Sequence, residues 1–194
     1  EGHLLPISSP DEMMDSFRYQ ALIQQFADVS GLDESTYEVL YLGLINAFAA
    51  CVQLLPRQTN GLLGGLFSEA IARASLVMQL PENQSLTDLQ KYALFSAAIL
   101  CDISHVACSH CVIITDKEGN FSQEWNPFAA DMVASSGTHY KLYPRHYLHQ
   151  RLQGSMTVLL ARQLMPREGF LWLSSDFEIY SHWLDALQGD DSRG

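Results

Sequence analysis

Basic residues are scarce in this sequence: 11 Lys and Arg stand against 22 Asp and Glu, which gives a formal net charge of −11. A strongly negative domain repels the phosphate backbone of nucleic acids, which binding proteins neutralise with clustered Lys and Arg. Here the basic residues are mostly scattered along the chain. We therefore expect that any grip on DNA belongs to another part of the protein or to a partner.

Cysteines and long apolar runs are also few. The four cysteines are unevenly spaced in a chain of 194 residues, which is not the pattern of a disulfide framework. We expect reduced thiols and a cytoplasmic protein. No stretch predicts a signal peptide or a membrane span. The sequence opens at EGHLLP without a methionine, so we expect it to be an excised part of a longer protein.

Helical periodicity dominates what is present. Hydrophobic residues make up 47% of the chain, enough for a sizeable core. A first helix is predicted from Ser9-Pro10 to Gly31 and a second, apolar on most faces, from Asp33 to Pro56. Ser85 is the predicted N-cap of a later helix. The further helices are predicted over residues 68–80, 89–103, 126–137, 145–165 and 176–188.

One part of the chain has the pattern of strands. HCVIIT (110–115) and FSQEW (121–125) flank the turn-like DKEGN, which predicts a β-hairpin. Residues 138–144 are expected to be an extended or irregular link, and residues 169–174 to be extended. The sequence thus predicts a mainly α fold, a helical bundle with a small β-hairpin, in a single domain over residues 1–194.

The stretch CDISHVACSHC (101–111) carries three cysteines, two histidines and an aspartate. One interpretation is a zinc site made of Cys101, His105, Cys108 and Cys111. Structural zinc sites usually consist of two ligand pairs separated by a loop, which disfavours it. Asp102 ends an apolar helix and therefore needs a partner. From the residues alone, hydration or backbone amides and a metal ion remain equal alternatives.

Several stretches, taken in order, resemble the N-terminal domain of TraI-type (MobH-class) conjugative relaxases, which are also described as helicases. They are LLPISSPDEM, YEVLYLGLINAFAACVQLLP, GGLFSEAIARA, ALFSAAILCDISH, EWNPF, YPRHYLHQRLQGSMTVLLARQLMP and WLDALQGD. The resemblance covers nearly the whole chain. It implies a role in DNA processing during plasmid or integrative-element transfer. Other conjugation proteins would be partners, and DNA would be bound through the full-length protein.

The resemblance also implies an HD-like helical bundle. In that family a histidine follows GGL and a later helix ends in His-Asp, as in the HD superfamily of metal-dependent phosphohydrolases, where the metals activate water. Here Glu69, or Ser68, stands at the first histidine and Cys101 at the second. His105 stands where a lysine is usual, and Asp102 is retained. The expected imidazole ligands are therefore missing.

We accordingly predict a degenerate metal site and expect no cofactor. The alternative is an active metal-dependent nuclease or phosphohydrolase that binds a divalent metal through Glu69, Cys101, Asp102 and His105. In that alternative Asp102 and His149 would be catalytic, because His149 lies in the segment PRHYLHQR, near which the family carries its own Arg and His residues. A third reading is a signalling domain that senses a nucleotide in the degenerate pocket.

Overall fold

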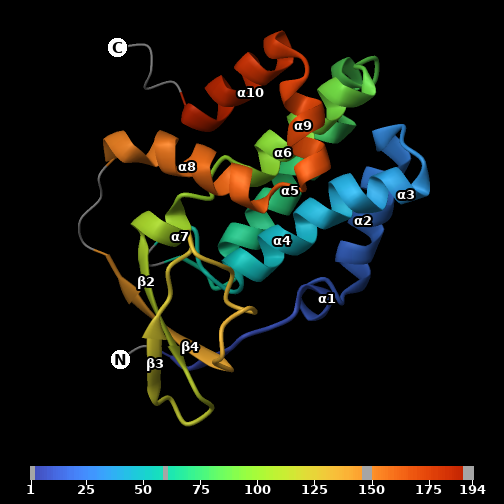
Figure 1. Ribbon diagram of the computed structural model, residues 1–194. Helices are drawn as coiled ribbons and strands as arrows, with labels where there is room; N and C mark the ends of the chain where they lie inside the picture. The colour runs from blue at the N-terminus through green and yellow to red at the C-terminus, as the bar shows by residue number, and fades with distance from the viewer. Residues whose placement is uncertain (1–2, 59–60, 146–149, 190–194) are drawn as a thin grey trace.

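The computed structural model describes residues 3–58, 61–145 and 150–189. A bundle of helices forms most of it, and a small sheet lies at one end (Figure 1). This confirms the predicted mainly α fold. The helices are α1 (Pro10–Met13), α2 (Phe17–Ser30), α3 (Glu34–Tyr37), the π-helix η1 (Glu38–Leu42), α4 (Gly43–Val52), α5 (Gly65–Gln79), the 3-10 helix η2 (Pro81–Asn83), α6 (Asp88–Leu100), α7 (His105–Cys108), α8 (Gln150–Leu164), α9 (Arg167–Ser174) and α10 (Phe177–Gln188).

The sheet is larger than the predicted hairpin. Its strands are β1 (Leu5–Pro6), β2 (His110–Thr115), β3 (Phe121–Glu124) and β4 (His139–Pro144), in the antiparallel order β1-β4-β2-β3. The hairpin of β2 and β3 is confirmed, with a bulge between Ile114 and Thr115. The stretch expected to be an extended or irregular link contains β4, which pairs with β2 along its whole length.

Two predicted helix boundaries differ because local caps were overlooked. The first helix is two, since Ser16 accepts a hydrogen bond from the Tyr19 amide and starts α2 anew. Gly31 ends α2 in the left-handed conformation, as predicted. The N-cap of α6 is Thr87 rather than Ser85, because Thr87 and Gln90 form a reciprocal capping box.

Two other segments differ from their predicted conformations. Residues 126–137 form turns rather than a helix, because the Asn126 and Asp131 side chains accept hydrogen bonds from the amides of Phe128 and Ala134. Residues 169–174, predicted to be extended, belong to helix α9. Leu173 is fully buried there, so the helix covers part of the core. In the predicted helix 145–165, residues 146–149 lie outside the described part.

The core lies between α2, η1, α4, α5 and α6 and contains a group of aromatic rings. The Tyr41 and Phe95 ring centroids are 4.4 Å apart, and Phe26 packs edge-on against Phe95 at 5.1 Å. Helix α9 approaches this core closely: a Cβ added at Gly169 would collide with the Tyr92 hydroxyl. Helices α9 and α10 close the bundle on this side (Figure 1).

Two segments are long and apolar enough to pass a test for membrane spans, Glu34–Val52 and Asp88–Cys108. This is weak evidence, because 56% of the most apolar window in each is buried inside the bundle and core helices pass the same test. The second segment also includes the turn at residues 101–104.

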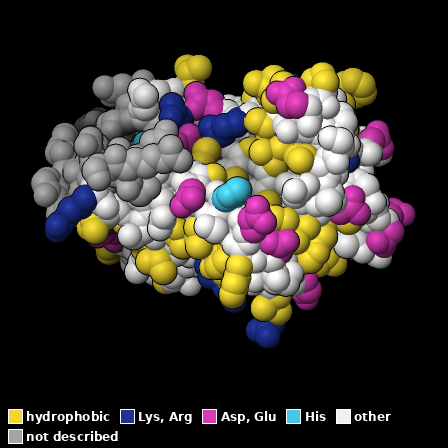
Figure 2. Space-filling view, turned by 90° about the horizontal axis from the view of Figure 1, so that it is seen from above, with side chains coloured by type: hydrophobic (Ala, Val, Ile, Leu, Met, Phe, Trp, Pro, Cys, Tyr) yellow, Lys and Arg dark blue, Asp and Glu magenta, His cyan; other side chains and the backbone are white. Residues whose placement is uncertain are grey.

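The surface of the protein carries many acidic side chains, in keeping with the net charge of −11. Figure 2 shows hydrophobic patches on the upper face with acidic side chains bordering them.

Candidate functional site

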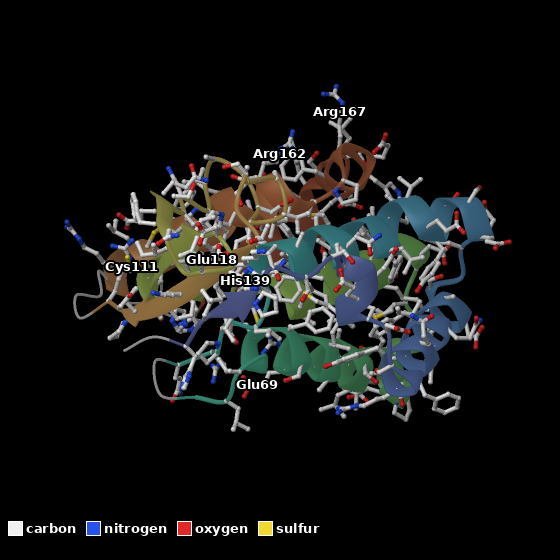
Figure 3. The ribbon with its side chains drawn as sticks, turned by 90° about the horizontal axis from the view of Figure 1, so that it is seen from below. Glu69, Cys111, Glu118, His139, Arg162 and Arg167 are labelled. Atoms are coloured by element: carbon white, nitrogen blue, oxygen red, sulfur yellow. The ribbon has the colours of Figure 1, made fainter. Side chains whose placement is uncertain are left out.

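The stretch CDISHVACSHC does not gather its thiols at one point. The Cys101 Sγ faces the Ala98 carbonyl oxygen at 3.8 Å, and Cys111 Sγ lies 3.4 Å from the Glu124 carboxylate. Figure 3 shows Cys111 at the sheet, apart from Glu69 on α5. Among the residues described, no three or more His, Cys, Asp or Glu side chains are grouped so that they could hold a metal ion. The zinc interpretation is therefore not supported by the geometry.

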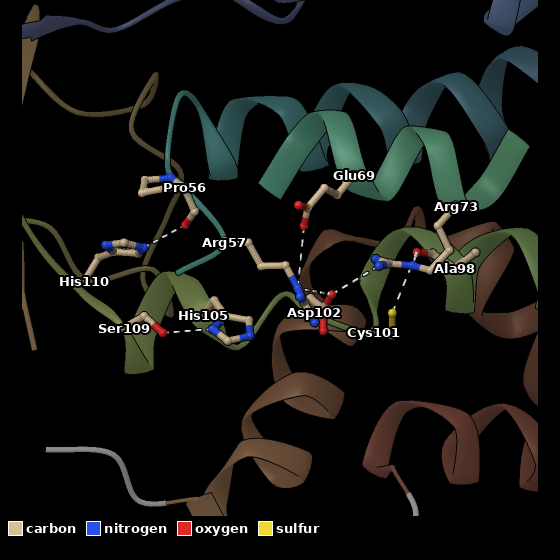
Figure 4. Close-up of polar contacts among 10 residues, drawn as sticks. All are labelled: Pro56, Arg57, Glu69, Arg73, Ala98, Cys101, Asp102, His105, Ser109 and His110. Carbon is tan, nitrogen blue, oxygen red and sulfur yellow. Dashed lines mark hydrogen bonds and ion pairs between the residues drawn. The ribbon is translucent and has the colours of Figure 1, made fainter. Parts of the chain in front are cut away.

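Asp102 is bound by two arginines, as Figure 4 shows. Its Oδ2 accepts a hydrogen bond of 3.0 Å from Arg57 Nε and one of 3.1 Å from Arg73 Nη1. The Asp102 side chain is 23% exposed. These charge-assisted hydrogen bonds answer the question that the sequence left open, because the partner of the half-buried carboxylate is a pair of guanidinium groups.

The two arginines come from different elements. Arg57 follows α4 in the loop that leads to α5, and Arg73 lies on α5 itself. Arg73 is further fixed by a hydrogen bond of 2.8 Å from its Nε to the Ala98 carbonyl of α6. Attraction by Asp102 is the main cause that raises the pKa of Arg57. The arrangement therefore ties the start of the loop, α5 and the end of α6 together.

Glu69 stands one helical turn before Arg73 on α5 and faces Arg57. Its carboxylate is 3.6 Å from Arg57 Nε, and its side chain is 56% exposed. This distance is too long for a strong hydrogen bond, so Glu69 contributes a weak, solvent-screened attraction. Glu69 and Asp102 thus share Arg57, where the metal-dependent alternative would have them share a metal ion.

Cys101 and His105 lie beside Asp102 but are held by other groups. Burial is the main cause that raises the pKa of the Cys101 thiol, so it stays protonated at neutral pH. Burial likewise lowers the pKa of His105, and its Nδ1 is 2.8 Å from the Ser109 hydroxyl oxygen. The imidazole is therefore neutral at pH 7. Each of the two side chains has a local partner inside its own segment.

His110 positions the loop that carries Arg57. Its Nε2 is 2.8 Å from the Pro56 carbonyl oxygen, and its side chain is buried. Because a carbonyl only accepts, Nε2 carries the proton. Burial is the main cause that lowers the pKa of His110. No sequence signal pointed to this role, since a histidine at the start of a strand has no characteristic pattern.

A polar cavity of about 940 Å³ opens beside the arginine-bound aspartate. Asp102 and His105 line one side, and Arg151 of α8 and Gln188 of α10 line the other. His149, the second predicted catalytic residue, lies outside the described residues. Arg57 and Arg73 were not anticipated as site residues. The signal for them was indirect: an aspartate that ends an apolar helix needs a partner for its charge.

The fold and the site define a mainly α domain in which the Asp102 carboxylate is paired with two arginines. Comparison with known families then gives its class. The model of the TraI_2 family, described as "Putative helicase", matches residues 2–193. The match spans almost the whole chain, so the chain belongs to this family. The resemblance to TraI-type conjugative relaxases is thereby confirmed. No curated protein matches the chain.

Proposed function

We propose that this domain acts as a non-hydrolytic docking module within a conjugative-transfer protein. It holds DNA-processing parts or partner proteins in place during plasmid or integrative-element transfer. The observation that carries the proposal is the Asp102 carboxylate, which is bound by Arg57 at 3.0 Å and by Arg73 at 3.1 Å. A divalent metal bound there would have to displace two cationic groups that already neutralise the carboxylate.

The residues present do not fit a catalytic metal. A hydrolytic metal needs several converging ligands and open positions for water and phosphate. Cys101 is a neutral thiol, His105 is paired with Ser109, and Glu69 faces Arg57. We therefore derive no hydrolytic step for this site and regard the arginine pair as its stable form.

The net charge and the free cysteines support the proposed docking role in the cytoplasm. With a net charge of −11 the domain is poorly suited to grip DNA itself, so DNA would be held by other parts of the protein. The four cysteines are all unbonded, as expected in the reducing cytoplasm. Docking to other conjugation proteins in the cytoplasm is consistent with both features.

Metal analysis of the purified protein tests the proposal directly. We expect substoichiometric Mn, Fe, Zn and Ni, and no hydrolysis of bis-p-nitrophenyl phosphate when Mn²⁺ is added. Stoichiometric metal together with turnover that Asp102→Asn abolishes would overturn it in favour of the nuclease or phosphohydrolase alternative.

A mating assay tests the same proposal in cells. The transfer protein that contains this domain would carry Cys101→Ser or His105→Gln. Both changes remove a ligand that hydrolysis would require, and docking predicts an unchanged transfer frequency. A loss of transfer on the order of a hundredfold with normal protein levels would contradict the docking proposal.

A further inference from the structure

A groove lies between the start of the α3–η1 helix and α9, on a different side of the bundle from Asp102. We refer to it as the α3–α9 groove. Its cavity volume is about 480 Å³, and it is lined by Leu32, Ser35, Thr36, Val39, Leu40, Glu168 and Trp172. Leu40 is buried, and Val39 is 47% exposed at the rim. Trp172 is fixed by stacking on Tyr92, with ring centroids 5.7 Å apart. The groove is therefore preformed and mostly apolar.

The borders of this groove are acidic. Glu168 lines the groove from α9, and the Asp33 carboxylate accepts a hydrogen bond of 2.6 Å from the hydroxyl of Ser35, which also lines the groove. The sequence contains no Lys, Arg or His between Arg18 and Arg57. Arg167 precedes Glu168 but points outward from the body of the protein in Figure 3. An apolar groove with acidic borders matches a partner with an apolar face and flanking positive charges.

The helical segment beside the groove has two unusual features. Glu38–Leu42 forms a π-helix, a rare form that is often found at functional sites. Of the side chains described, Tyr41 in this segment is the one with a buried polar atom that lacks a partner. The π-helical segment carries Val39 and Leu40, which line the groove, whereas Tyr41 is fully buried in the aromatic core.

We propose that the α3–α9 groove binds the apolar face of an amphipathic helix that carries Lys and Arg along its edges and belongs to another protein of the transfer machinery. The groove is lined by helices and by the link at Leu32 rather than by a strand, so an extended segment would find no sheet edge to join. A helix satisfies its own backbone and presents side chains at i, i+3, i+4 and i+7. This inference rests on the proposed docking function and identifies the surface that performs it.

Binding of a synthetic peptide tests the groove. The probe is a 15-residue helical peptide with Leu at i, i+3, i+4 and i+7 and Lys at the flanking positions, measured by calorimetry with the 194-residue chain. One control peptide has the same composition in an order without an apolar face, and another has Glu in place of Lys. We expect both controls to bind at least about tenfold more weakly. Equal binding of the reordered peptide would overturn the proposal, because it would reflect general charge attraction.

Groove variants assign the binding to this surface. Val39→Arg and Thr36→Arg place a cation in the groove, and we expect each to weaken peptide binding about tenfold or more. The matched control is Leu76→Arg on α5, where the side chain is 66% exposed and outside the groove. Melting temperatures within about 2 °C of the unchanged protein would show that each variant folds. If neither groove variant weakens peptide binding, the proposal is wrong.

A mating assay separates this inference from the proposed function. If the groove docks a partner, Val39→Arg lowers transfer at least tenfold while Leu76→Arg does not. If Val39→Arg keeps full transfer and the protein is metal-free, the docking function stands but this groove is not its surface. If Val39→Arg instead dissolves a dimer seen by sedimentation, the occupant is a second copy of the chain and the proposal is wrong.

Discussion

Arg57 and Asp102 are 45 residues apart in the sequence, yet Arg57 Nε donates a hydrogen bond of 3.0 Å to Asp102 Oδ2. The bond joins the loop after α4 to the turn after α6. Arg73 completes the pair from α5, so one carboxylate links the loop after α4, helix α5 and the turn after α6. The stability of this end of the bundle therefore depends on charge pairing.

The first prediction concerns Asp102 itself. Asp102→Asn keeps the shape but removes the charge that both guanidinium groups contact, so we expect a loss of about 2 kcal/mol in the free energy of unfolding. For a chain of this size that corresponds to a fall of about 6 °C in melting temperature. Glu69→Gln is the matched control and should cost less than about 0.5 kcal/mol, since Glu69 is 56% exposed. Equal effects of the two changes would contradict the geometry.

The two arginines are predicted to differ. Arg73 donates to both Asp102 and the Ala98 carbonyl, whereas Arg57 is more exposed and has Glu69 as its second partner. Arg73→Met should therefore cost about 1 kcal/mol more than Arg57→Met in urea denaturation. In the Asp102→Asn background both costs should shrink, and the difference gives the coupling energy. If the cost of each arginine change is the same with Asp102 and with Asn at position 102, the ion pairs contribute nothing to stability.

A third prediction concerns Gln53, which fixes the N-terminal segment. Its buried amide accepts from Ser8 N at 2.8 Å and donates to Ser8 O at 2.9 Å, and its backbone φ is 47°. Gln53→Ala should destabilise the protein by about 2–3 kcal/mol and speed amide exchange at Ile7. Gln53→Gly loses the same bonds but relieves the backbone, so it should be about 1 kcal/mol less harmful. A larger loss with Gly would argue against backbone strain.

The fourth prediction is a pH dependence. Burial lowers the pKa of His105 and His110 below the ordinary 6.5. Below that pH these histidines bind protons more readily in the unfolded chain than in the folded chain. The stability that they contribute is therefore complete above about pH 7 and is lost as the pH falls toward the lowered folded-state pKa. Unfolding at pH 7.5 and 5.5 measures this. His110→Gln keeps a donor for Pro56 without titrating, and it should reduce the loss between the two pH values. An unchanged loss would assign the effect to other groups.

Much of the fold follows from local sequence. Gly31 and Asp33 mark a helix end and the next helix start because their conformations and caps involve near neighbours only. The hairpin of β2 and β3 is equally local. The errors are of two kinds: caps and turns formed by small polar side chains, as at Thr87 and Asn126, and elements whose conformation depends on distant packing.

Strand β4 and helix α9 belong to the second kind. Residues 139–144 become a strand because β2, some thirty residues earlier, offers a full ladder of partners. Residues 167–174 become a helix because Leu173 and Gly169 are buried, with Gly169 packed closely against Tyr92. Short apolar runs carry no clear period, so the sequence could not choose between helix and strand there.

The sequence by itself determined the family, the mainly α class, the acidic charge and the unusual position of Asp102. Tertiary structure alone decided that Asp102 meets Arg57 and Arg73, and that Leu40, Val39 and Trp172 border one groove. The physical reason is the separation along the chain over which each interaction acts. Helix caps and periodicity act over a few residues, whereas a carboxylate accepts whichever cation the folded chain brings within about 3 Å.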